Sequence, residues 1–295
     1  MPTHEGVSAS VVAVPAGHWP NLLDFLAQRM PRIPRGEWAQ RLAQGLVLQE
    51  NGQSAQADQA CLTGQRFFYY RHVPDEPQLP RQAAVVFEDD HLLVADKPHF
   101  MPVTPSGPYV QQCLLVQLKR LTGLADLVPL HRIDRETAGL VLFGKRLQDR
   151  DAYHALFREH SIHKTYHAVA AHRPELALPR VHTSRLAEDP VHFFRMREVE
   201  GQHNSETRLQ VVRSEGKRAL YQLEPVTGKR HQLRVHMLSL GAPIEGDQFY
   251  PEVLRGPDEA EDFNHPLQLL AARIAFKDPF TGQESSFSSK LTLNF

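Results

Sequence analysis

The sequence has few cysteines and no long apolar segment. Its two cysteines, Cys61 and Cys113, lie far apart and form no Cys-x-x-Cys pair, which excludes a disulfide framework and a zinc ribbon. No apolar run reaches the about 20 residues of a membrane-spanning helix, and the first residues lack the basic and apolar regions of a signal peptide. We therefore expect a protein of a reducing, cytoplasmic compartment with no membrane partner.

The sequence also lacks an excess of either charge. The formal net charge is −1 over 295 residues, so no global basic field attracts the chain to nucleic acid. No lysine precedes Lys97. Any site for a polyanion must therefore be a local patch of basic side chains.

Length and turn residues predict two domains. The chain is longer than one typical domain, and residues 74–82 contain three prolines beside the acidic pair Asp75-Glu76, a composition typical of an extended linker. We expect a small domain at residues 1–73, the linker at 74–82 and a larger domain at 83–295.

The small domain is expected to combine two short helices with a few strands. Residues 1–20 are predicted to be loosely ordered apart from the apolar run Val11 to Val14. Helical patterns begin at Asn21 and span Arg35 to Gln44, followed by strand patterns at 46–48 and 67–73 around the turn Asn51-Gly52.

The larger domain alternates hairpins with a few helices. Hairpins are predicted at 84–95 and 207–223, helices at 111–121, 149–160 and 231–240, single strands at 140–143 and 163–170, and final strands at 267–276 and 286–293. We predict an α+β fold with a mixed, mostly antiparallel sheet. The acidic residues 258–262 are predicted to be a solvated insertion.

The stretch from His131 to Leu140 joins two arginines and two acids to an apolar strand. Asp134 lies on the turn that feeds this strand, so its carboxylate is either a solvated loop charge or one held beside a cavity, with Arg132 or Arg135 as local partners. Taken alone, the stretch favours the solvated alternative.

Three further clusters carry reactive or basic side chains. They are Lys164-Thr-Tyr166, the segment Thr227 to His236, and Gly241 to Asp247. Each has an ordinary structural alternative: Tyr166 as a packed strand tyrosine, Arg234 as a surface helix residue, and Asp247 as a turn cap. No single cluster therefore identifies a function, and the order of the clusters along the chain is the more informative feature.

That order resembles the RluA-type family of pseudouridine synthases over about residues 85–293. The family's His-Arg-Leu/Ile-Asp motif matches residues 131–134, its Lys-x-Tyr element matches Lys164 and Tyr166, and its Thr-Gly-Arg-x-His-Gln-Ile-Arg-x-His element matches residues 227–236. The chain departs from the pattern at Lys229, Leu233 and Leu270, where arginine, isoleucine and histidine are usual. The resemblance implies the pseudouridine synthase fold and isomerisation of uridine in structured RNA, either large-subunit ribosomal RNA or transfer RNA.

The resemblance also assigns roles within the site. Asp134 is implied to be the nucleophile of a reaction without cofactor or metal, and Arg234 is implied to be its charged partner. Tyr166 would stack on the base and assist removal of the carbon 5 proton, while Leu233 forms an apolar floor. The predicted phosphate contacts are Arg132, Arg135, Lys164, Lys229 and Arg230. His131 is expected to be a hydrogen-bonded turn residue, and the protein is expected to be a monomer.

The small domain resembles a degenerate S-four-like RNA-binding domain, a module first named for a ribosomal protein. The resemblance rests on the helix that begins at Asn21, the second helix with Trp38, and the Leu46-Val-Leu48 to Asn51-Gly52 turn. The arginines that cluster around the helix pair are Arg29, Arg32, Arg35 and Arg41. The alternative is an appendage that no longer binds RNA.

The sequence also allows three alternative interpretations: a kinase, an RNA-binding protein without catalysis, and a metal site. A kinase would share His131-Arg-Ile-Asp134, but its Gly-rich loop, Asp-Phe-Gly motif and downstream asparagine are missing. An RNA-binding protein of the same fold without catalysis is the second. A metal site at the histidines 154, 160, 163 and 167 is the third, and their spacing puts them on no common face.

Overall fold

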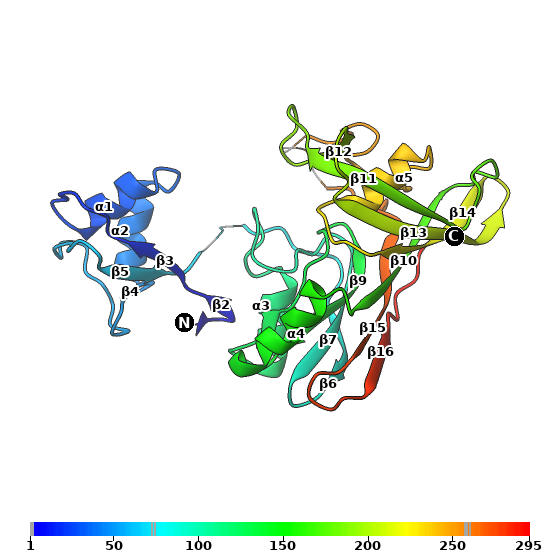
Figure 1. The fold of residues 1–295 in the computed structure, drawn as a ribbon. Coiled ribbons are helices and arrows are strands. Elements are labelled where there is room, and N and C mark those ends of the chain that lie inside the picture. The colour runs from blue at the N-terminus through cyan, green and yellow to red at the C-terminus, as the bar shows by residue number, and fades with distance from the viewer. Residues whose placement is uncertain (1–2, 72, 74, 257–258, 260) are drawn as a thin grey trace. The chain divides into compact units, whose positions relative to one another are not determined.

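The structure is a computed structural model that describes residues 3–71, 73, 75–256, 259 and 261–295 (Figure 1). Three predicted features touch residues outside this set: His72 in the last strand of the small domain, Pro74 in the linker and Asp258 in the acidic segment. The chain divides into two compact units, residues 1–76 with 107–111 and residues 77–106 with 112–295.

The first unit is built on a three-stranded antiparallel sheet in the order β3-β5-β4. Its strands are β3 Ser10–Ala13, β4 Val47–Gln49 and β5 Arg66–Tyr69, and its helices are α1 Leu22–Arg29 and α2 Arg35–Ala43. The Asn21 side chain caps α1 by accepting from the Asp24 amide at 2.9 Å. Trp38, Phe25 and Phe67 are fully buried in the core between sheet and helices.

Two features of this unit differ from the predictions. Residues 3–20 are more regular than expected, because β1 Thr3–His4 pairs with β2 Val7–Ser8 and is followed by β3; residues 1 and 2 lie outside the described set. Residues 107–111 join the unit because the Glu76 carboxylate accepts from the amides of Val110 and Gln111, at 2.7 and 2.8 Å. The contact of Glu76 with residues 110 and 111 joins segments that are distant in the sequence, so no local sequence pattern predicts it.

The second unit is organised around an eleven-stranded sheet. Its order is β12-β11-β13-β14-β10-β15-β9-β7-β6, with β16 paired to β15 and β8 to β9. The strands are β6 Ala84–Glu88, β7 Leu92–Lys97, β8 Val128–Pro129, β9 Ala138–Gly144, β10 His163–Ala171, β11 Arg180–Glu188, β12 Met196–Val199, β13 Ser205–Glu215, β14 Arg218–Pro225, β15 Leu269–Lys277 and β16 Glu284–Ser288. Pairing between β15 and β9 is parallel and the other pairs are antiparallel. This is the mixed α+β fold that the sequence predicts.

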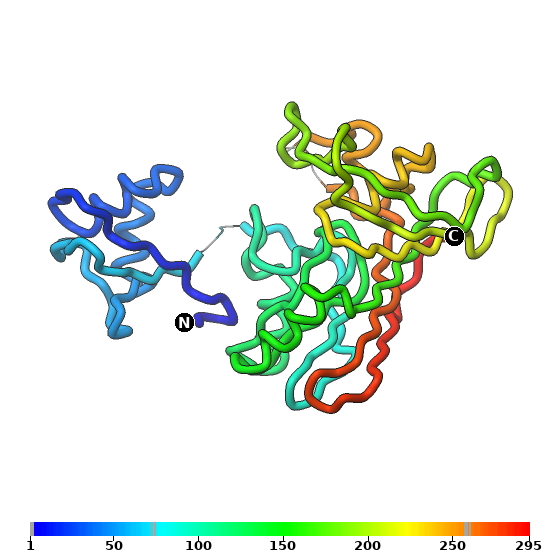
Figure 2. Tube along the Cα trace, in the orientation of Figure 1, coloured from blue at the N-terminus to red at the C-terminus, as the bar shows by residue number. Residues whose placement is uncertain are grey.

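Helices pack on this sheet and close its core. The unit contains α3 Leu114–Thr122, the short 3₁₀ helix η1 Leu147–Asp149, α4 Arg150–Arg158 and α5 Gln232–Ser239. Leu233 and Met237 of α5 pack against Tyr221 and Leu223 of β14. Figure 2 shows β9, in green, beside the much later β15, in orange, so the sheet brings together segments far apart in the sequence. Among the described residues, no helix has both the length and the apolarity needed to cross a membrane.

The predicted hairpins are present as β6–β7 and β13–β14, whereas β11 and β12 were missed. In β11 the buried positions include Ser184, and His182 on the same face is hydrogen-bonded to Glu198. A strand with polar side chains on its inner face lacks the alternation of apolar and polar residues that marks a half-buried strand. The last strand, β16, ends at Ser288 rather than at Leu293.

Candidate active site

Asp134 lies on the turn that leads into β9, at the edge of a cavity of about 780 Å³. The amide of Thr137 donates to the Asp134 carbonyl at 3.2 Å, and the Lys97 ammonium donates to the Arg135 carbonyl at 3.0 Å. These bonds fix the turn from both sides. The Asp134 side chain keeps 26% of its surface exposed, so a substrate can reach it.

Arg234 extends from α5 toward this turn and is almost completely buried, with 1% of its side chain exposed. Its Nε and Nη2 donate to the Asp247 carboxylate at 2.7 and 2.6 Å. Its Nη1 lies 3.5 Å from Asp134 Oδ2 and 3.7 Å from Glu136 Oε2, and has no hydrogen-bond partner among the described residues. The guanidinium therefore holds one carboxylate tightly and faces two others.

The charge of Arg234 is secured by these carboxylates. Burial acts to lower the pKa of the guanidinium, but the hydrogen bonds and charge of Asp247, together with the charges of Asp134 and Glu136, raise it above its usual value. A permanent positive charge in a cavity offsets the desolvation cost of an ionised carboxylate beside it. The geometry thus suits Asp134 for nucleophilic chemistry.

Tyr166 faces the same cavity from β10, as does Lys164 two residues earlier in the strand. Burial and the negative charge of Asp134 raise the pKa of its phenol well above the usual range. The hydroxyl is therefore protonated at neutral pH, and the ring offers a flat apolar surface.

All of the predicted site residues line this one cavity. It brings together Arg132, Asp134, Arg135, Lys164, Tyr166, Lys229, Arg230, Leu233 and Arg234. Arg132, Lys229 and Arg230 are exposed and Leu233 is buried. Burial lowers the pKa of Lys164. The arrangement combines a carboxylate with a buried cation, an aromatic ring, an apolar floor and a basic rim.

Similarity to known proteins identifies the family. Residues 91–239 match the family model described as RNA pseudouridylate synthase. The chain is 32% identical to an uncharacterized RNA pseudouridine synthase of Synechocystis sp., over 78% of this chain and 79% of the relative. It is 35% identical to the dual-specificity RNA pseudouridine synthase RluA of Vibrio cholerae, over 66% of this chain and 77% of the relative. The chain belongs to the RluA-type RNA pseudouridine synthases.

A solved structure agrees with this assignment. The human RNA pseudouridylate synthase domain containing 4 has 26% sequence identity and a TM-score of 0.56, with 70% of this chain and 88% of that chain covered. The match confirms the predicted fold and the predicted class of enzyme, an isomerase that forms pseudouridine in RNA. The segment matched by the family model contains Asp134, Tyr166 and Arg234 and ends before Asp247.

Three residues of this synthase that lie around the Asp134 turn or its partner Arg234 are not among the predicted site residues. Asp247 was expected to cap a turn, and it does so by accepting from the amides of Phe249 and Tyr250 at 2.9 and 3.2 Å, yet it also binds Arg234. Glu136 is 9% exposed and faces Arg234. Lys97 is fully buried. For Asp247, the pair Gly246-Asp247 is the only local pattern in the sequence, and it does not indicate that the carboxylate is buried against Arg234.

Lys97 has an unusual environment for a lysine. Burial lowers its pKa to about 7, against the opposing charges of Glu136 and Asp134. Its ammonium donates to the carbonyls of Pro98 and Arg135, both at 3.0 Å. Lys97 therefore supports the backbone next to Asp134 and titrates near neutral pH.

Arg135 is joined by ion pairs to the acidic segment. The Arg135 guanidinium binds Glu136, at 2.9 Å, and both carboxylate oxygens of Glu261. The Glu261 side chain is only 6% exposed, so the prediction of a solvated insertion is wrong for this residue. The reason is a tertiary ion pair, which the run of acids at 258–262 does not reveal.

His131 has the hydrogen-bonded turn position expected of it. Its Nε2 accepts from the Leu142 amide at 3.1 Å. Burial and the nearby Lys164 lower the pKa of the imidazole to about 3. A neutral ring that accepts a backbone hydrogen bond fits the structural role expected of His131.

One group of side chains in the described residues has the geometry of a metal site. It consists of His182, Glu198 and His236, whose ligand atoms lie within 4.8 Å of one another. These atoms already have partners: His182 Nε2 pairs with Glu198 at 2.8 Å, and His236 bonds to Ser205 at 3.0 Å and to Thr207 at 2.9 Å. The histidines 154, 160, 163 and 167 do not take part in this group.

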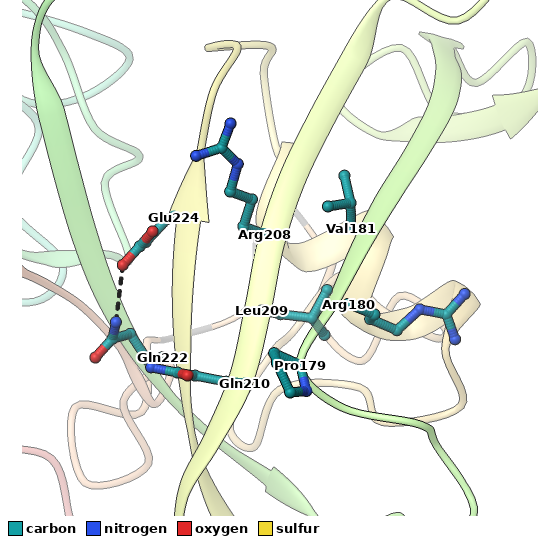
Figure 3. Close-up of a pocket in the computed structure, with 8 residues that line it drawn as sticks. All are labelled: Pro179, Arg180, Val181, Arg208, Leu209, Gln210, Gln222 and Glu224. Atoms are coloured by element: carbon teal, nitrogen blue, oxygen red, sulfur yellow. Dashed lines mark hydrogen bonds between the residues drawn. The ribbon is translucent and has the colours of Figure 1, made fainter.

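A second cavity, of about 360 Å³, lies over β11, β13 and β14 (Figure 3). It shares no lining residue with the cavity of Asp134. Gln222 donates to Glu224 at 2.8 Å within it, and its lining contains no aspartate, histidine or tyrosine. The residues suited to uridine isomerisation are therefore gathered in the cavity of Asp134.

Proposed function

We propose that this synthase converts uridines of transfer RNA or large-subunit ribosomal RNA to pseudouridine with Asp134 as the nucleophile. The observation that supports the proposal most directly is the position of Asp134, exposed to a large cavity and 3.5 Å from the buried Arg234 guanidinium. Both classes of RNA are substrates within the family that the sequence resembles.

The reaction needs a nucleophile and a confined base, and this site supplies both. The bond between N1 of the base and C1′ of the ribose breaks, the base rotates, and C5 bonds to C1′ before losing its proton. The Asp134 carboxylate attacks either C1′ of the ribose or C6 of the base, and it is released when the new bond is complete. Arg234 stabilises the carboxylate before attack and after release.

Tyr166 and Leu233 are proposed to hold the base during its rotation. The ring of Tyr166 provides a stacking surface and the buried Leu233 provides an apolar floor. An apolar slot allows the uracil to turn because it forms no directional bonds with the ring faces. The C5 proton leaves once C5 has bonded to C1′, and N1 gains a proton, so the reaction is an isomerisation without net change. The Tyr166 hydroxyl, which stays protonated because its pKa is raised, relays the C5 proton by giving up its own to the released Asp134 carboxylate or to water as it accepts the new one.

Basic side chains at the rim are proposed to hold the RNA backbone. A uridine in structured RNA must leave its stack, which costs a few kcal/mol, and phosphate contacts from Arg132, Lys164, Lys229 and Arg230 offset that cost. Arg135 is bound by Glu136 and Glu261. We infer that its main task is to position the turn, with any phosphate contact secondary.

The first unit is proposed to extend the RNA contact. Arg29 and Arg32 are exposed, whereas Arg35 pairs with Asp24 at 2.9 Å and Arg41 pairs with Glu37. The double variant Arg29→Ala/Arg32→Ala should weaken RNA binding and reduce the salt slope of log Kd by about 1 to 2. An unchanged slope would show that the unit is an appendage without RNA contact.

We further propose that the enzyme acts as a monomer in the cytoplasm, without metal or cofactor. No disulfide joins Cys61 and Cys113, which fits a reducing compartment. The catalytic groups named above are all side chains of this chain, so neither a partner subunit nor a bound ion is needed to complete the site.

The decisive experiment compares Asp134→Asn with the parent. RNA labelled with tritium at C5 of uridine releases tritium when pseudouridine forms. We expect Asp134→Asn to lower release by about a thousandfold or more, because the nucleophile is lost, with RNA affinity nearly unchanged. Equal release by variant and parent would exclude Asp134 as nucleophile. A parent that binds RNA and releases no tritium would support the non-catalytic alternative.

A further inference from the structure

The loop between β11 and β12 exposes two apolar side chains beside the basic rim of the site. Val191 and Phe193 are 78% and 79% exposed, the highest values among large apolar residues in the described part of the chain. The carbonyl of Phe193 accepts from Arg230 Nη2 at 2.6 Å, and Arg230 lines the catalytic cavity. The exposed ring is therefore attached to the rim where the RNA backbone is proposed to lie.

The loop is held in a defined conformation. Asp189 Oδ1 accepts from the amides of Val191 and His192 at 2.8 and 2.9 Å, and the Asp189 amide donates to the Arg195 carbonyl at 3.1 Å. The Arg195 guanidinium lies 4.9 Å above the Tyr250 ring and donates to the Pro251 carbonyl at 2.9 Å. Phe193 is thus presented to solvent by a fixed backbone.

A chain of ring contacts connects this loop to the catalytic guanidinium. Phe193 meets Phe194 edge to face, with ring centres 5.6 Å apart, and Phe194 lies 5.2 Å from Phe249. Arg234 Cζ lies 5.2 Å from the centre of the Phe249 ring. The exposed ring is therefore packed, through two neighbours, against the residue that faces Asp134.

We propose that Phe193 is a stacking platform for an unpaired base of the substrate RNA near the target uridine. Aromatic rings beside basic residues are the usual means of binding splayed-out bases, because the ring stacks and the cations hold the backbone. A preorganised ring loses little conformational entropy on binding. Because every base has a flat face, the contact adds affinity without selecting a particular base. The inference rests on the proposal that structured RNA is the substrate.

The test measures RNA affinity in the Asp134→Asn background, so that no turnover occurs. The probes are transfer RNA and large-subunit ribosomal RNA transcripts. Phe193→Ala should raise Kd by about tenfold on the transcript that the parent binds more tightly, while the salt slope of log Kd stays at the parental value. Phe193→Trp should restore the affinity, and its indole fluorescence should be quenched by the RNA.

Two matched variants separate stacking from other effects. Lys229→Ala should reduce the salt slope by about 1, because it removes a charge. Leu147→Ala removes an apolar side chain that is 72% exposed outside the cavity, and it should leave Kd unchanged. In the catalytically active protein, Phe193→Ala should raise KM and leave kcat at saturating RNA unaltered.

The proposal would be overturned if the Kd of Phe193→Ala stayed within about twofold of the parental Kd on both transcripts. It would also be overturned if the substitution changed the salt slope of log Kd and caused no loss of affinity at high salt. Because the readout is affinity, it is independent of whether the parent releases tritium. Failure of the proposed catalysis and failure of the stacking platform are therefore distinguishable.

Discussion

Arg234 binds Asp247 through two hydrogen bonds, of 2.7 and 2.6 Å, while both side chains are 1% exposed. The bidentate pair fixes the plane of the guanidinium and leaves Nη1 directed toward Asp134. Asp247 does not itself line the cavity of Asp134, and its side chain binds Arg234, which does. We infer that Asp247 positions Arg234, which faces the proposed nucleophile Asp134.

Loss of the Asp247 carboxylate should therefore reduce both stability and turnover. Asp247→Asn removes one partner of a buried ion pair, which typically costs about 3–5 kcal/mol of unfolding free energy. We expect kcat to fall with little change in KM, because the RNA contacts at the rim remain. Chemical denaturation and tritium release measure the two effects.

The matched control for this variant is Glu245→Gln. Glu245 also binds an arginine through two hydrogen bonds, at 2.9 and 2.7 Å from Arg218, but these side chains are 35% and 42% exposed. An exposed pair contributes about 0–1 kcal/mol, so this variant should unfold nearly as the parent does. Equal stability of both variants would contradict the positioning role of Asp247.

Substitutions at Tyr166 should separate stacking from proton transfer. Tyr166→Phe keeps the ring and removes the hydroxyl, so RNA affinity should persist while kcat falls by about a hundredfold, a typical effect of losing one acid–base group. Tyr166→Ala should lose affinity as well. Parental turnover by Tyr166→Phe would show that the hydroxyl has no part in removing the C5 proton.

The stability of the enzyme should depend on pH through Lys97. Its pKa is lowered to about 7 in the folded protein, whereas an unfolded lysine titrates near 10.4. Between these values the unfolded chain binds the extra proton, so the unfolding free energy rises with pH. Below about 7 both states are protonated and the cost of the buried charge is fully present.

The variant Lys97→Met lacks the titrating ammonium, so it serves as the reference for the pH dependence of the unfolding free energy that Lys97 causes. The stability of the parent relative to the variant should increase by up to about 1.4 kcal/mol per pH unit between about pH 7 and pH 10. Urea unfolding of both proteins at pH 7 and pH 9 tests this. A difference that does not change with pH would show that Lys97 titrates normally.

Removal of metal ions should leave the enzyme active. The proposed reaction uses a carboxylate, a guanidinium and a phenol, and the His182, Glu198 and His236 atoms are occupied by hydrogen bonds. Dialysis against a chelator should change neither tritium release nor the melting temperature. If the chelator abolished activity and a single divalent metal restored it, the metal-free reaction would be contradicted, and the group His182, Glu198 and His236 would be the candidate metal site.

Several elements of the fold could be predicted from the sequence because they depend on residues close together in the chain. The β6–β7 and β13–β14 hairpins, the helix that begins at Asn21 and the strand β10 follow from turn residues and from local periodicity. The strand β11 could not be predicted in this way, because its inner face is polar and is satisfied by Glu198 and His236 from other elements.

The family and the place of Asp134 in its motif follow from sequence alone, since the motif at 131–140 and the elements at 164–166 and 227–236 are local patterns in a fixed order. Which charges meet could be seen only in the folded chain. Arg234 and Asp134 are a hundred positions apart, and Arg135 binds Glu261 from a segment that looked solvated. Charge pairing depends on distance in space and on burial, and neither is encoded in the order of residues along one strand or helix.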